Sequence, residues 1–255
     1  MRRITLPLAA LLLVAVTALP LAAQSGPEAS VEADPYADFV AVFESSVDNP
    51  ALLLRALDEV GEALRTGNPD VAAMEAQYPG AVDQLLAAMT PMLSQHSQNI
   101  RGQFQRELAV LLREHLTPAE AGAAATFYAS PIGRRVMASI EGNMRFDALI
   151  DEAVATDGLA DISTEAIDRD LRRTQAAAVA DVSSADMAEM NRMARNATWL
   201  PKLAQLRPQI LTLRTAAENA PMDPELEAAM GDAILAVVER ITAQDPPKQQ
   251  PVRRK

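Results

Sequence analysis

The chain has 255 residues and no cysteine, and its 34 acidic residues outnumber its 23 basic residues, giving a formal net charge of −11. The absence of cysteine excludes disulfide bonds and thiol catalysis. The acidic balance disfavours nucleic-acid binding, because phosphate recognition needs clustered Lys and Arg. A chain of this length, with 49% hydrophobic residues, can bury a substantial core without disulfides.

Residues 1–23 have the layout of a secretory signal peptide. Two arginines follow the first methionine, an apolar run comes next, and small residues close the segment, which predicts cleavage after Ala23. A membrane anchor is the alternative, but the apolar run is shorter than the roughly 20 residues that span a bilayer, and Pro7 interrupts it. We therefore expect a periplasmic protein of a Gram-negative bacterium, with no stable membrane insertion after signal removal. Residues 24–33 are expected to form a linker.

Residues 34–244 are predicted to form a compact all-α domain of about eight to ten helices. The abundance of Ala, Leu, Met, Glu and Arg favours helix, and apolar residues recur every three or four positions. One apolar stripe follows Asn49-Pro50, a pair typical of a helix start, and a longer stripe covers 85–115. Thr90-Pro91 is expected to kink or split the longer helix. We find no alternating strand pattern, and residues 245–255 are predicted to be a disordered basic tail.

Two segments 66 residues apart share a pattern typical of a helix start: "LTPAEAGAAATFYAS" and "VSSADMAEMNRMARN". In the first segment Thr117 and Glu120 take the positions of a capping box, in which the cap side chain and the acid each bond the other's backbone. Ser183 and Asp186 take the same positions in the second segment. Two interpretations stay open, namely two degenerate helix-corner-helix repeats or chance similarity between amphipathic segments. The two repeats would lie within 97–155 and 163–221.

The segment "ATFYASPIGRRVM", residues 125–137, predicts a sharp corner between two helices, and we call it the signature corner. Ser130 is a good N-cap and Pro131 a good first helical residue. Gly133 falls in the first turn of the new helix, where the missing side chain lets another backbone or ring approach closely. Phe127 is expected in the core, with the Tyr128 hydroxyl at its edge.

The signature corner resembles a known family. Its Phe-Tyr-x-Ser-Pro-x-Gly pattern over 127–133, together with the capped helix before it, is similar to the exported bacterial domain of unknown function 2059 family. The resemblance covers about a tenth of the chain and implies export and a helical fold, but it supplies no activity. The alternative to a structural corner is a ligand clasp around Tyr128, Arg134 and Arg135, which makes the two arginines candidate interaction residues.

The sequence holds no recognisable catalytic or metal-binding pattern, so we predict a non-enzyme without cofactor or metal. His96 and His115 are 19 residues apart on the long stripe, about 28 Å along a straight helix, and are expected at the edge of the core. We predict a protein-interaction module of the cell envelope, with an unidentified periplasmic protein as its partner. The alternative is a carrier of a small apolar ligand in an interhelical pocket. An exposed patch of Met and Leu would favour the partner, and an enclosed apolar cavity would favour the carrier.

Overall fold

The computed structural model describes residues 34–45, 50–155 and 161–243, so the predicted signal peptide, linker and basic tail lie outside the described residues. Within the described part the regular structure is helical and no strand occurs, which confirms the predicted all-α fold. No helix within these ranges is long and apolar enough to cross a membrane. In chain order the helices are α2 (Pro35–Ser45), α3 (Pro50–Gly67), α4 (Pro69–Gln77), α5 (Ala81–His115), α6 (Pro118–Ala129), α7 (Pro131–Gly142), α8 (Asp147–Ala155), α9 (Thr164–Asp181), α10 (Ser184–Ala194), α11 (Trp199–Glu218) and α12 (Pro224–Ala243).

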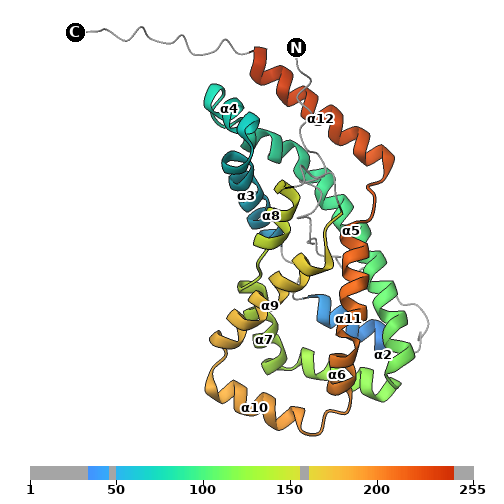
Figure 1. Cartoon of the computed structure of the whole chain (residues 1–255). Coiled ribbons are helices and arrows are strands. Elements are labelled where there is room, and N and C mark those ends of the chain that lie inside the picture. The colour runs from blue at the N-terminus through green and yellow to red at the C-terminus, as the bar shows by residue number, and fades with distance from the viewer. Residues whose placement is uncertain (1–33, 46–49, 156–160, 244–255) are drawn as a thin grey trace.

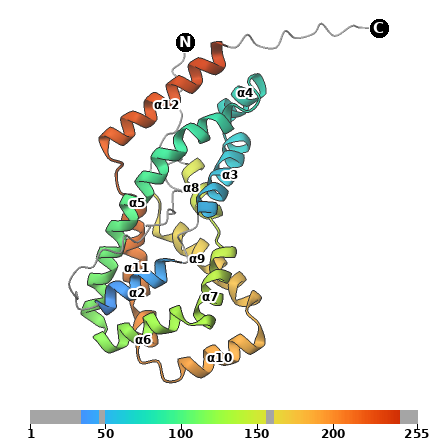
Figure 2. The same ribbon diagram turned by 180° about the vertical axis from the view of Figure 1, so that it is seen from behind.

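The 35-residue helix α5 is the central element of the fold. It continues through Pro91, so of the two expected outcomes at this position, a kink or a split, the split does not occur. In Figures 1 and 2, α3, α4 and α12 lie along its N-terminal half, while α2, α6 and α11 gather around its C-terminal half. Helix α10 lies at the far end of the molecule, between α9 and α11 in the chain.

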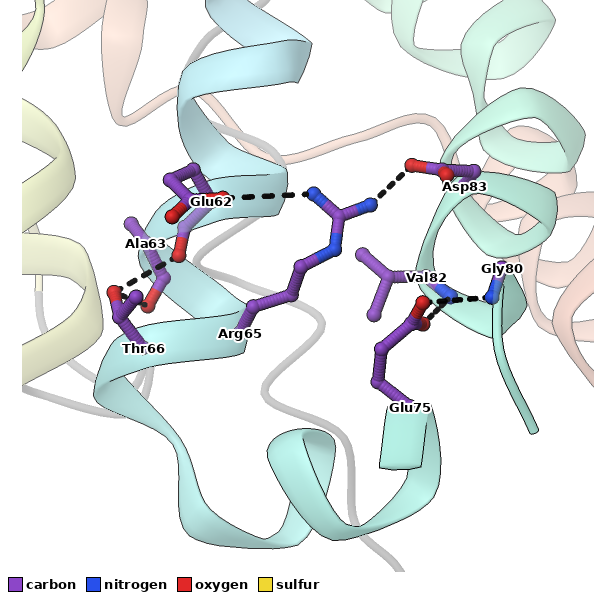
Figure 3. Close-up of polar contacts among 8 residues, drawn as sticks. All are labelled: Glu62, Ala63, Arg65, Thr66, Glu75, Gly80, Val82 and Asp83. Atoms are coloured by element: carbon purple, nitrogen blue, oxygen red, sulfur yellow. Dashed lines mark hydrogen bonds and ion pairs between the residues drawn. The ribbon is translucent and has the colours of Figure 1, made fainter. Parts of the chain in front are cut away.

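The start of α5 is capped by a side chain from the preceding helix. Gly80 occupies the N-cap with a left-handed φ of 83° and has no side chain to cap the helix. The carboxylate of Glu75 supplies the missing acceptors, at 2.6 Å from the amide nitrogen of Gly80 and 2.9 Å from that of Val82 (Figure 3). Arg65 of α3 forms an ion pair with Asp83 in the first turn of α5. Glu75 thus provides acceptors for two amides at the helix start, and the contacts link α3, α4 and α5.

The hydrophobic interior consists of two clusters along α5. The first core is built from α3, α4, the N-terminal half of α5, α8, α9 and α12. The second core is built from α2, the C-terminal half of α5, α6 and α11. On α5 the first core ends at Leu93 and the second begins at Phe104. The apolar stripe that the sequence predicts as one surface therefore serves two separate cores.

A layer of buried polar residues separates the two cores. His96 and Ser97 of α5 are buried between them, and burial lowers the pKa of His96. Arg101 donates to the carbonyl oxygen of Glu44 at 2.8 Å, and its guanidinium lies 3.7 Å from the buried carboxylate of the same residue. Glu218, buried at the end of α11, pairs with Arg214 at 2.5 Å. Burial raises the pKa of Glu218, while Arg214 opposes that shift.

Candidate functional site

The helix before the signature corner begins with a complete capping box. The Thr117 side chain accepts from the amide of Glu120 at 3.3 Å, and the Glu120 carboxylate accepts from the amide of Thr117 at 2.9 Å. Lys202 of α11 donates to the same carboxylate at 2.6 Å. The hydrogen bonds from Lys202 and then from the Thr117 backbone lower the pKa of Glu120 from 4.5 to about 2. Glu120 therefore caps α6 and also ties it to α11.

Ser130 and Gly133 build the corner itself. The Ser130 hydroxyl donates to the carbonyl oxygen of Phe127 at 2.6 Å and accepts from the amide of Gly133 at 3.0 Å. Pro131 begins α7 directly after this cap. A Cβ on Gly133 would lie 2.2 Å from the Phe127 carbonyl oxygen and 2.7 Å from the Cα of Tyr128. The first turn of α7 thus packs directly on the backbone of the last turn of α6, which only glycine permits.

Five of the nine aromatic side chains form one cluster against the corner. Tyr128 stacks on Phe39 of α2 at 5.6 Å and meets Phe127 edge-on at 5.2 Å. Trp199 of α11, which is buried, lies 5.6 Å from Phe127 and 6.1 Å from Tyr128. Phe43 completes the cluster from α2. Both Phe127 and Tyr128 are half-buried against the second core, and burial raises the pKa of Tyr128.

The two signature arginines have different partners. Arg134 donates to the carbonyl oxygen of Ala129 at 2.5 Å, so it satisfies an acceptor at the end of α6. Arg135 forms an ion pair with Asp186 of α10 at 2.5 Å, which raises the pKa of Arg135 and lowers that of Asp186. The ring contacts of Tyr128 run instead to Phe and Trp side chains. The structure therefore places the three residues of the clasp hypothesis in three separate sets of contacts.

The second segment of the proposed repeat shares the cap but not the corner. The Ser183 hydroxyl accepts from the Asp186 amide at 3.1 Å, as expected for a helix start. Helix α10 then ends at Ala194, and α11 begins at Trp199 without a side-chain cap on its first residues. None of the residues of α10 is buried, whereas α6 buries two alanines. The two segments therefore share a capped short helix followed by a second helix, but only the first has a corner capped by a side chain.

The two histidines differ in burial. His96 is only 3% exposed, deeper than the expected core edge, while His115 is exposed, which corrects the expectation for that residue. The reason is that Leu112 and Leu116 take the buried positions at the end of α5. Within the described ranges no group of three or more His, Asp or Glu side chains could hold a metal ion.

A groove runs between α5 and α11 on the surface of the second core. It has a volume of about 520 Å³ and is open to solvent. Leu111 and Leu213 form its apolar floor, and both pack on the second core. Val110, with 52% of its surface exposed, stands on its wall. Its polar border comprises Arg106, Glu107, Glu114, Gln209 and Thr212.

Neither this groove nor the contact that buried Asp170 makes with α8 is indicated by any pattern in the sequence. The Asp170 carboxylate on α9 is buried and accepts from the amides of Ala148 and Leu149, at 2.9 and 3.0 Å, at the start of α8. Both features depend on residues distant in the chain. Periodicity identifies which face of a helix is apolar, but it does not identify the helix that will cover that face.

Comparisons with known proteins find one match. No curated protein and no solved structure matches the chain. Residues 102–145 span the C-terminal part of α5, α6 and α7, and so include the signature corner and five of the residues that line the groove. This segment matches the family described as "Uncharacterized protein conserved in bacteria (DUF2059)", which confirms the predicted resemblance to that family over residues 102–145.

Proposed function

We propose that this chain is an exported, periplasmic protein that binds a segment of another protein in the groove between α5 and α11, and that it has no catalytic role. Export is supported by the signal-peptide layout of residues 1–23 and by the resemblance to an exported family. The binding role is supported by one observation, the open groove with an apolar floor and a charged border. Apolar side chains of a partner would be covered in such a groove while its polar groups meet the charged border.

The groove favours an aliphatic segment with basic residues beside it. Its volume of about 520 Å³ has room for a few aliphatic side chains over Leu111 and Leu213. Its border carries two carboxylates, Glu107 and Glu114, and one guanidinium, Arg106. The chain as a whole has a net charge of −11, which attracts basic partners at long range. The occupant we propose is therefore a helical or extended segment of a partner protein with aliphatic side chains and flanking Lys or Arg.

The open shape of the groove distinguishes this proposal from the carrier alternative. Small-molecule sites bury about 70–90% of their ligand, whereas this groove is open to solvent. A small apolar ligand lying in it would keep much of its surface in water. A protein segment would cover the groove with its own backbone and polar face, and so complete the burial of Val110.

The test uses two exposed valines that differ only in location. Val110 lies on the groove wall and is 52% exposed, while Val179 lies on α9, away from the groove, and is 58% exposed. We expect Val110→Lys and Val179→Lys to melt like the wild type, because neither side chain is buried. Only Val110→Lys should fail to complement a deletion strain. Failure of both variants, or of neither, would contradict a binding role for the groove.

Photo-crosslinking identifies the class of occupant. A photoreactive phenylalanine at position 110 should form an adduct with a discrete protein in cells, and the same group at position 179 should not. Leu213→Glu, which places a charge on the groove floor, should abolish the adduct while the protein stays folded. A small-molecule adduct at position 110 would support the carrier instead. Mass determination of the periplasmic protein tests export, since we expect the mature chain to begin at Gln24.

A further inference from the structure

Helix α10 is attached to the rest of the molecule mainly through α7. It spans Ser184–Ala194 and lies at the far end of the fold (Figures 1 and 2). None of its residues is buried. Arg135 of α7 forms an ion pair with Asp186 in its first turn. The helix therefore depends on surface contacts for its position.

The methionines of the mature sequence fall into three groups by packing. Four are buried: Met89, Met137, Met222 and Met230. Three are half-buried and pack against the first core: Met74, Met92 and Met144. The remaining three are half-buried on α10 and pack against neither core: Met187, Met190 and Met193. This last group recurs every three residues and forms one stripe along a short helix.

We infer that Met187, Met190 and Met193 form an oxidant-sensitive modification site that loosens α10 from α7. The reagent is a two-electron oxidant of the peroxide class. The thioether sulfur attacks the peroxide, its O–O bond breaks, and one oxygen atom is transferred to sulfur. The sulfur is oxidised to the sulfoxide and the peroxide is reduced to water, so atoms and electrons balance. The change is reversible through methionine sulfoxide reductases.

Packing explains why these three sulfurs should react first. Oxidation requires the oxidant to reach sulfur, and side chains held in a core are exposed only by larger opening motions. A helix without buried residues opens at low cost. The three methionine side chains are half-buried, and a polar sulfoxide disfavours that partial burial. The ion pair between Arg135 and Asp186 does not depend on sulfur and would remain as the tether at the first turn.

The first experiment compares two sets of three methionines in one chain. The full-length mature protein is treated with hydrogen peroxide, and peptide mapping follows the gain of one oxygen at each methionine. Met187, Met190 and Met193 should be modified severalfold faster than Met74, Met92 and Met144, which are also half-buried but pack against the first core. Equal rates for the two sets would overturn the inference.

The second experiment measures the release of α10. Trypsin cleavage after the exposed Arg192 and Arg195 should become severalfold faster in the oxidised protein, because cleavage requires local unfolding. The variant in which Met187, Met190 and Met193 are replaced by leucine removes the sulfur and keeps an apolar stripe. Its cleavage rate should be insensitive to peroxide. An unchanged rate in the oxidised wild type, or the same acceleration in the leucine variant, would refute the loosening of α10. Neither outcome bears on the groove, since its lining residues include no methionine.

Discussion

Replacing Gly133 by alanine should destabilise the protein, although alanine is the better helix former. A methyl group at this position would lie 2.2 Å from the carbonyl oxygen of Phe127, whereas carbon and oxygen in contact are normally separated by about 3.3 Å or more. The obstacle is backbone rather than a flexible side chain, so α6 and α7 must move apart. That movement would also break the bond from the Gly133 amide to the Ser130 hydroxyl.

The expected change in the free energy of unfolding combines two destabilising effects and one stabilising effect. Overpacking costs about 1–3 kcal/mol, and loss of the Ser130 cap costs about 1 kcal/mol. Alanine in a helix gains about 1 kcal/mol over glycine. We therefore expect a net destabilisation of roughly 1–3 kcal/mol. In a chain of this size each kcal/mol lowers the melting temperature by about 2–4 °C.

Gly122 provides the matched control in the preceding helix. It lies within α6, and a Cβ added there would meet nothing within 4 Å. Gly122→Ala should therefore stabilise the protein by about 0.5–1 kcal/mol. Urea unfolding of both variants, with the midpoint and slope compared with wild type, gives the sign directly. If Gly133→Ala is as stable as Gly122→Ala, the close backbone contact does not exist and the corner does not require glycine at position 133.

Three further changes test the contacts around the corner and α8. Glu120 has a folded pKa of about 2, below its ordinary 4.5, so its contribution is complete above about pH 4.5 and is lost as the pH falls towards 2. Glu120→Gln should flatten the pH dependence of urea unfolding in that window, and an unaltered profile would contradict the assignment. Trp199→Ala should cost about 3–5 kcal/mol, because the ring is buried against Phe127 and Tyr128; a urea midpoint within error of wild type would rule this out. Asp170→Ala should cost about 1–3 kcal/mol by leaving the first amides of α8 without acceptors, and Asp170→Asn should recover part of that loss in the same assay.

Features of the corner that depend on nearby residues could be predicted from the sequence. Thr117 and Ser130 bond to amides three residues further on, so the whole interaction lies within a short segment. The need for glycine at position 133 could also be anticipated as a close approach. The group that approaches Gly133, the backbone of Phe127 and Tyr128, could not be anticipated, because it depends on the angle between α6 and α7. That angle is fixed by packing over residues that no local pattern includes.

The aromatic cluster shows why the site as a whole could not be predicted. Tyr128 stacks on Phe39, which lies 89 positions earlier in the chain. Aromatic side chains pair through shape and ring geometry, which leave no spacing signal between distant segments. The groove has the same origin, because it exists only where α5 and α11 lie side by side without filling the space between them. The helix starts are therefore readable in the sequence, while the surfaces between helices are not.

The buried polar layer on α5 explains how one continuous stripe can serve two cores. His96 and Ser97 are buried on α5 between the residues of the two cores, and α2 docks against the second core. Arg101 and the buried Glu44 make that docking directional, because the guanidinium bonds the Glu44 carbonyl oxygen and lies beside its carboxylate. A buried ion pair adds little net stability, but separating its partners in a buried setting costs about 3–5 kcal/mol. A shifted arrangement of α2 would carry that cost in full. We therefore expect the contact between Arg101 and Glu44 to favour specificity, by holding α2 at one position along α5.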